Sequence, residues 1–194
     1  MNNKLINTIV ESRLNQVLIN ELDSYLINDV KEAYNLQEIV NKRLSSSGLG
    51  EIIGYKIGCT NESIQKELGV NNPIFGPIFN NKIIENNKKI SIKDFIKVGV
   101  ECEIYVKISK EINKNTNYNI NNIKNFIDNY GVSLELVENR FLNIKKNKIE
   151  HIIIDGSLGN SIILGKEISN HLSDFSKFIG RLFINNKEVY SNFA

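Results

Sequence analysis

Apolar residues recur at helical spacing along the first fifty residues of the chain. Between Ile6 and Leu22 they follow one another at intervals of three and four, which predicts an amphipathic helix. A second helix is predicted from Asn28 to Leu44, with Asn28 or Asp29 as its N-cap. The sequence Ser-Ser-Ser-Gly at residues 45–48 then ends this helix.

Beyond residue 50 the pattern becomes that of short strands. Strands are predicted at residues 52–57, 98–108, 132–138, 149–154 and 161–164, with a strand pair within 82–92 and a hairpin over 182–189. Short helices are predicted at residues 62–68, capped by Thr60 or Asn61, and from the polar loop 113–122 to about Tyr130. Helices followed mostly by strands predict an α+β fold with a mixed sheet or β-roll.

Length and composition narrow the class of protein. The 194 residues suit a single domain, with a helical part at 1–48 and a β-rich part at 49–194. Because 24 basic residues stand against 22 acidic ones without a basic cluster, we expect no nucleic-acid partner. No apolar run approaches the roughly 20 residues that span a bilayer, so we expect no membrane partner. The polar N-terminus and the two cysteines favour a reduced cytoplasmic setting without a signal peptide or disulfide framework.

The strand predicted at residues 98–108 contains Glu101 and Glu103, two positions apart. Alternate residues of a strand point to one face, so their carboxylates would lie side by side. Like charges that close favour a compensating cation, and Mg2+ or Mn2+ prefers carboxylate oxygens. Glu135, in a second acidic strand, is a candidate third ligand. The alternative interpretation is a solvated strand face that carries charge.

Six segments, taken in chain order, resemble the fumarylacetoacetate hydrolase superfamily. The similarity is to the branch of 2-oxopent-4-enoate (2-keto-4-pentenoate) hydratases and 4-oxalocrotonate decarboxylases. The segments are Asp29-Val-Lys-Glu-Ala-Tyr34 with Gln37, Gly54-Tyr-Lys-Ile-Gly58 with Thr60, Leu68-Gly-Val70 with Pro73-Ile-Phe-Gly76, Val100-Glu-Cys-Glu-Ile104, Leu134-Glu-Leu-Val-Glu-Asn-Arg140, and Asp155 to Gly165. Each motif is weak alone, but their order and spacing extend over nearly the whole chain.

The resemblance implies a metal site and a reaction. Glu101, Glu103 and Glu135 would bind Mg2+ or Mn2+, and Lys56 would reach a small 2-oxo acid beside the metal. The implied reaction is that of a hydro-lyase of aromatic-compound catabolism, which adds water to a 2-hydroxy-2,4-dienoate to give a 4-hydroxy-2-oxo acid. A metal-dependent 2-oxo acid decarboxylase of the same branch is the alternative, and a homo-oligomer is expected.

Weaker candidates for contact with the site or its ligands are Phe75, Gly76, Arg140 and Asp155. Arg140 is expected to pair with Glu138 or to orient Glu135.

Two departures from the family pattern qualify this prediction. Ile74 stands where the family has an acidic residue suited to proton transfer, and Asp155-Gly-Ser-Leu158 replaces Asp-Asn-Ala-Ser. Family members also continue beyond the position of Ala194. We therefore expect either a fragment or a truncated, inactive paralogue that lacks the C-terminal strands of the fold. Such a chain would have an uncovered sheet edge that favours self-association.

Overall fold

The computed structural model describes residues 2–20, 22, 25–169 and 175–193. The chain forms two compact units. The first comprises Met1–Gly99 and Leu136–Ile162, and the second comprises Val100–Glu135 and Ile163–Ala194. The three long strands β4, β5 and β6, whose bounds are given below, contribute residues to both units.

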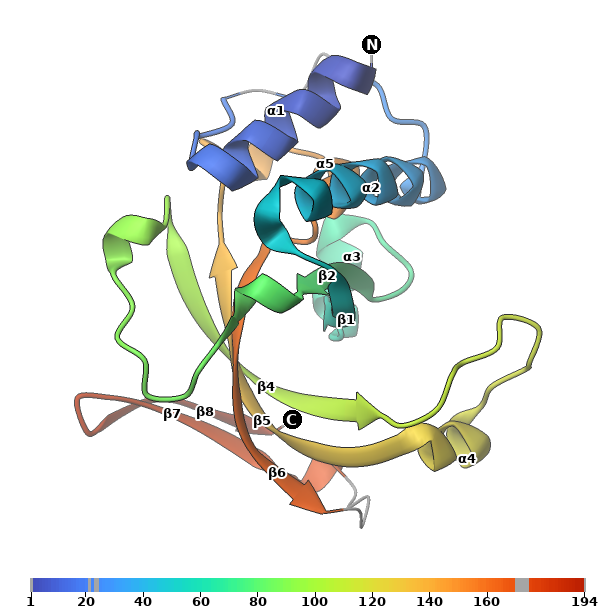
Figure 1. The fold of residues 1–194 in the computed structure, drawn as a ribbon, viewed down its shortest axis with the longest axis vertical. Helices are drawn as coiled ribbons and strands as arrows, with labels where there is room; N and C mark the ends of the chain where they lie inside the picture. Colours follow the sequence, from blue (N-terminus) through green and yellow to red (C-terminus); the bar gives the residue numbers. More distant parts are fainter. Residues whose placement is uncertain (1, 21, 23–24, 170–174, 194) are drawn as a thin grey trace. The chain divides into compact units, whose positions relative to one another are not determined.

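Helices α1 (Asn2–Asn15) and α2 (Val30–Leu44) pack together and build the core of the first unit (Figure 1). Asp29 is the N-cap of α2, and its carboxylate accepts a hydrogen bond from the backbone N–H of Glu32 at 2.7 Å. The first helix is shorter than predicted. It ends at Asn15, and Gln16 adopts a left-handed φ of 56°. The predicted extension to Leu22 is therefore wrong for the residues described after Asn15.

Residues 149–154 form helix α5 (Ile149–Ile154), so the strand predicted there is wrong. His151 and four isoleucines of this helix are all buried. Six residues are too few to show a helical period, and the run of isoleucines at 152–154 resembles a buried strand. Packing against α2 decides in favour of the helix.

A two-stranded antiparallel ribbon, β1 (Ile52–Gly58) with β2 (Ile74–Phe79), carries the Lys56 motif of the first unit. Between the two strands lies α3 (Glu62–Leu68), as predicted. Asn61 caps its start, and Gly69 ends it with a left-handed φ of 70°.

The larger sheet has the strand order β3-β6-β5-β4. Its strands are β3 (Ile83–Ile84), β4 (Val98–Ile108), β5 (Ile127–Glu138) and β6 (Gly159–Ser169). Strands β4 and β5 are antiparallel, because the N–H of Ser109 donates to the Phe126 carbonyl while the N–H of Asn139 donates to the Lys97 carbonyl.

Three further differences from the prediction lie around this sheet. Helix α4 is limited to Ile120–Ile123, and residues predicted as helix up to Tyr130 begin β5 instead. Within 82–92 only β3 forms, so the predicted strand pair is wrong. Strand β6 extends well beyond the predicted 161–164. The remaining short helical turns are Ser45–Leu49, Asn80–Lys82, Ile92–Asp94, Lys124–Phe126, Ile144–Lys146 and Phe175–Lys177.

The predicted C-terminal hairpin is present as β7 (Ile179–Ile184) and β8 (Lys187–Phe193). Asn185 and Asn186 form its turn with φ values of 51° and 62°, the conformation of a two-residue hairpin loop. Large apolar side chains are exposed along it, including Phe183 at 54%. No helix in the described parts of the chain is long and apolar enough to cross a membrane.

Candidate functional site

Three glutamate side chains converge in the second unit. Glu101 and Glu103 come from β4 and Glu135 from β5, and one carboxylate oxygen of each lies within 4.8 Å of the others. Glu135 is buried, Glu103 is half-buried and Glu101 is exposed. The first two meet because alternate residues of a strand share a face. Glu135 joins them only because β5 pairs with β4.

Two glycine contacts define how β4 and β5 are aligned. A Cβ atom added to Gly99 would lie 2.9 Å from Cγ2 of Val137, and one added to Gly131 would lie 2.5 Å from Cε1 of Tyr105. Both contacts fit one register, in which Gly99 stands across from Val137 and Tyr105 across from Gly131, and the hydrogen bond from the N–H of Asn139 to the Lys97 carbonyl continues this register. Both strands advance by the same number of residues between these contacts, so we infer that no bulge interrupts this stretch.

This alignment determines which residues of β5 are the cross-strand neighbours of Glu101 and Glu103. Glu101 stands across from Glu135, and Glu103 stands across from Ser133. Carboxylates so close repel one another unless a cation neutralises part of their charge. Three carboxylates supply only oxygen atoms, and this donor set fits hard cations such as Mg2+, Ca2+ and Mn2+. Glu101, Glu103 and Glu135 are called the acidic triad below.

Tyr105 lies next to the acidic triad on the same face of the sheet. Its ring covers Gly131, and its hydroxyl donates to the backbone carbonyl of Gly165 at 3.0 Å. Burial raises the pKa of the Tyr105 hydroxyl, and the negative charge of Glu167 raises it further. The hydroxyl therefore stays protonated at neutral pH, and the ring is held as a wall beside the triad.

Lys56 lies in the first unit, half-buried in β1, where it pairs across the ribbon with Gly76. The next pair on the same face, Gly58 with Ile74, places the Ile74 side chain diagonally next to Lys56. Ile74 is only 5% exposed, so this side of Lys56 is apolar. Because the triad belongs to the second unit, the approach of Lys56 to a bound metal stays a prediction.

Phe75 is held through its backbone by three side chains. Its N–H donates to the Tyr34 hydroxyl at 3.1 Å, and its carbonyl accepts from Gln37 Nε2 at 3.1 Å and Ser157 Oγ at 2.9 Å. The Phe75 ring also stacks on Tyr34, with centroids 4.2 Å apart. The Tyr34 and Gln37 motif of α2 therefore positions the strand that pairs with Lys56.

The loop after α5 makes the closest approach to this strand. A Cβ atom on Gly76 would lie 2.2 Å from the carbonyl oxygen of Gly156, so no side chain is tolerated at Gly76. Gly156, Ser157 and Leu158 all have left-handed φ angles, of 87°, 55° and 62°. Such a conformation is strained for Ser157 and Leu158 and needs support from its surroundings. Ser157 receives part of this support from its bond to Phe75.

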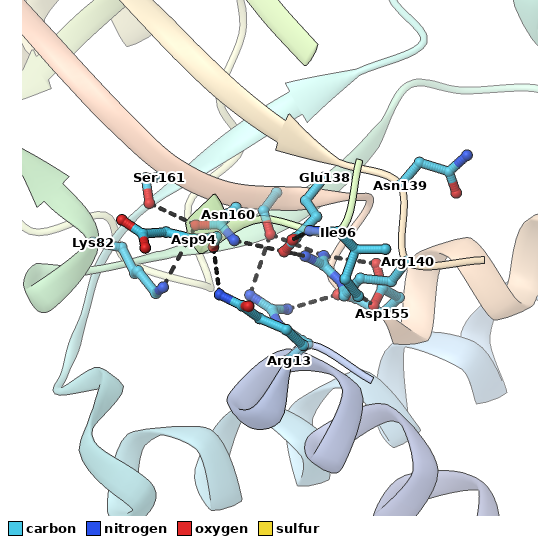
Figure 2. Close-up of polar contacts among 12 residues, drawn as sticks. Arg13, Lys82, Asp94, Ile96, Glu138, Asn139, Arg140, Asp155, Asn160 and Ser161 are labelled. Atoms are coloured by element: carbon cyan, nitrogen blue, oxygen red, sulfur yellow. Dashed lines mark hydrogen bonds and ion pairs between the residues drawn. The ribbon is translucent and has the colours of Figure 1, made fainter. Parts of the chain in front are cut away.

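Arg140 is buried among acidic partners (Figure 2). Its Nε and Nη2 donate to the two carboxylate oxygens of Asp155 at 2.7 and 2.9 Å, and its Nη1 donates to Glu138 at 2.8 Å. The pairing with Glu138 was one of the two roles predicted for Arg140. The bidentate contact with Asp155 ties the end of α5 to the segment that follows β5.

A second buried arginine, Arg13 of α1, joins the same network (Figure 2). Its Nη1 donates to the Asp155 carbonyl at 2.6 Å. Burial, followed by the positive charge of Arg140, lowers the pKa of Arg13 to about 10. No sequence motif singles out Arg13 as a functional residue. The available signal was a charge on the apolar face of a helix, one turn after the buried Ile9.

Comparison with known proteins identifies relatives of this chain. No protein-family model matches it. It is 26% identical to 2-keto-4-pentenoate hydratase 1 of Dechloromonas aromatica (strain RCB), over 78% of this chain and 56% of that protein. It is 23% identical to 4-oxalocrotonate decarboxylase of Pseudomonas putida, over 81% of this chain and 59% of that protein. The chain thus spans little more than half the length of these curated relatives.

The solved structures agree with the sequence relatives. The 4-oxalocrotonate decarboxylase from Pseudomonas putida G7, complexed with magnesium and adipate, matches with a TM-score of 0.87 at 19% identity. The match covers 99% of this chain and 73% of that chain. The predicted α+β fold is therefore confirmed, as part of that larger fold. The predicted resemblance to the hydratase and decarboxylase branch is confirmed as well.

Proposed function

We propose that this chain is the metal-binding part of a lyase that acts on small 2-oxo acids. Its reaction is the addition of water to a 2-hydroxy-2,4-dienoate, which gives a 4-hydroxy-2-oxo acid. The observation that carries this proposal is the approach of three carboxylates to within 4.8 Å on one sheet face. The sequence similarity to a 2-keto-4-pentenoate hydratase supports the choice of reaction.

In this proposal Glu101, Glu103 and Glu135 hold one Mg2+ or Mn2+ ion. When bound, the ion acts as a Lewis acid that stabilises negative charge on the enolate of a 2-oxo acid. The carboxylates position this charge centre, and Glu135 is buried, which limits competition from water on its side. The neighbouring Tyr105 ring lies over Gly131 on the same face, and its hydroxyl is bonded to the Gly165 carbonyl.

Lys56 is the proposed partner for the reacting carbon chain. Its ammonium group can donate a proton or stabilise negative charge, and it has no acceptor. Ile74, its diagonal neighbour, cannot exchange a proton. Because one positioned acid or base typically contributes about 10²- to 10⁴-fold, we propose that this chain is a weak hydratase.

A metal-dependent 2-oxo acid decarboxylase is the second candidate. The similarity to a 4-oxalocrotonate decarboxylase favours it. Ile74 favours it as well, because loss of carbon dioxide generates an enolate by cleavage of a carbon–carbon bond and needs no activated water. Both reactions use the same triad and the same stabilisation of the enolate.

Calorimetric titration with Mn2+ and with Mg2+ tests the metal site directly. We expect Glu103→Gln to bind at least about tenfold more weakly than the wild type, because affinity for hard cations follows the charge of the ligand set. Glu188→Gln, on the exposed hairpin strand β8, is the control and should bind as the wild type does. Equal affinities for the wild type and Glu103→Gln would refute the metal site.

Two activity assays then separate the two candidate reactions. A hydratase reduces the absorbance of 2-hydroxypenta-2,4-dienoate, whereas a decarboxylase releases carbon dioxide from 4-oxalocrotonate.

A further inference from the structure

Ser133 is a buried hydroxyl without a hydrogen-bond partner among the described residues. Its side chain is 2% exposed, and its Oγ makes no hydrogen bond there. A buried polar group without a hydrogen-bond partner costs free energy. In folded proteins, such a group can be satisfied by a bound water, ion or ligand. The position of Ser133 in the sheet indicates which kind of partner its hydroxyl binds.

The strand alignment places Ser133 on the face that carries the acidic triad. It lies two positions before Glu135 on β5, so both side chains point the same way. It also stands across from Glu103 on β4, next to the pair of Tyr105 and Gly131. Ser133 therefore has Glu135, Glu103 and the Tyr105–Gly131 pair as its neighbours on this face.

The charges around Ser133 indicate the chemistry of its partner. Ionised carboxylates only accept hydrogen bonds, so the triad contributes no donor to a bound anion. A serine hydroxyl contributes one O–H donor in the same place. An anionic ligand held beside the triad by a cation would leave at least one oxygen in need of such a donor.

We infer that Ser133 is a ligand-binding residue of the acidic site, whose hydroxyl donates a hydrogen bond to an anionic oxygen of a 2-oxo acid. This inference rests on the proposed function, because it requires a cation at the triad to hold the acid.

The test uses oxalate as the probe, because it is a small dianion that chelates a divalent cation through adjacent oxygens. Affinity for Mn2+ is measured first by calorimetry, and affinity for oxalate is then measured at saturating Mn2+. The variants are Ser133→Ala and Ser133→Cys, since the thiol of cysteine is nearly isosteric but a weak donor. Ser12→Ala is the matched control, because Ser12 of α1 is also 2% exposed with an unpartnered Oγ but lies in the first unit.

We expect both Ser133 variants to bind Mn2+ as the wild type does and oxalate about tenfold more weakly, equivalent to about 1.4 kcal/mol. Ser12→Ala should match the wild type in both titrations. Thermal unfolding checks that each variant is folded, and if Ser133→Ala is not, Ser133→Cys decides the question.

Three outcomes would overturn the inference. If the Ser133 variants bind oxalate as tightly as the wild type, the hydroxyl makes no bond to the ligand and only fills space. If they lose Mn2+ as well, Ser133 serves the cation or the strand rather than the acid. If the wild type itself binds no Mn2+, the proposed function fails together with the inference, which distinguishes this case from the first two.

Discussion

Glu138 is a buried carboxylate whose contribution to stability depends on pH. Burial alone would raise its pKa, but the N–H of Ile96, the charge of Arg140 and the amide of Asn160 together lower it below the ordinary value of 4.5. A group whose pKa is lower in the folded than in the unfolded state stabilises the fold above the unfolded pKa. That contribution is lost as the pH falls through the folded pKa.

We therefore expect the free energy of unfolding to decrease as the pH falls from about 5 through the region below 4.5. Glu138→Gln should be less stable at pH 7 by roughly 1.5–3 kcal/mol, because the buried Arg140 loses one charged hydrogen-bond partner and keeps its bidentate contact with Asp155. Its stability should also vary less with pH in the acid range. Urea unfolding at several pH values measures both effects, with the exposed Glu67→Gln of α3 as the control. Parallel pH profiles for Glu138→Gln and the wild type would contradict the assignment.

At the scale of elements, the pairing of β4 with β5 depends on an aromatic side chain lying over a glycine. A methyl group at residue 131 would meet the Tyr105 ring at 2.5 Å, and the hydrogen bond to Gly165 holds that ring in place. We expect Gly131→Ala to reduce the free energy of unfolding by about 1–3 kcal/mol through overpacking. Tyr105→Ala should lose stability as well, but the double variant should lose less than the sum of the two, because the clash is gone. Additive losses in urea unfolding would mean that the ring does not cover Gly131.

At the scale of the molecule, the proposed chemistry divides between the two compact units. Lys56 lies in the first, and the acidic triad lies in the second. We expect Lys56→Ala to retain wild-type affinity for Mn2+ while turnover of 2-hydroxypenta-2,4-dienoate falls about 10²- to 10⁴-fold. Ile74→Asp should raise turnover, because it restores a group that exchanges protons next to Lys56. Lys66→Ala, on the exposed side of α3, should behave as the wild type. Wild-type turnover in Lys56→Ala would exclude the lysine from the reaction.

Local geometry explains which parts of the fold and site could be predicted from the sequence. Glu101 and Glu103 share a face because they lie two positions apart in a strand, and this needs no knowledge of the rest of the chain. The Asp29 cap and the Asn185-Asn186 turn likewise depend on a few neighbouring residues. The resemblance to the hydratase and decarboxylase branch depends on the order of motifs, which the sequence also contains.

Long-range packing decided the rest. The isoleucines of α5 have no period to read, so only contact with α2 makes them a helix rather than a strand. Glu135 and Ser133 reach the triad face through the alignment of β5 with β4, and no local pattern encodes that alignment. The burial of Arg13 depends on Asp155, which is distant in sequence but in contact in space. The sequence by itself determined which side chains could do chemistry, whereas strand pairing and helix packing decided which of them meet.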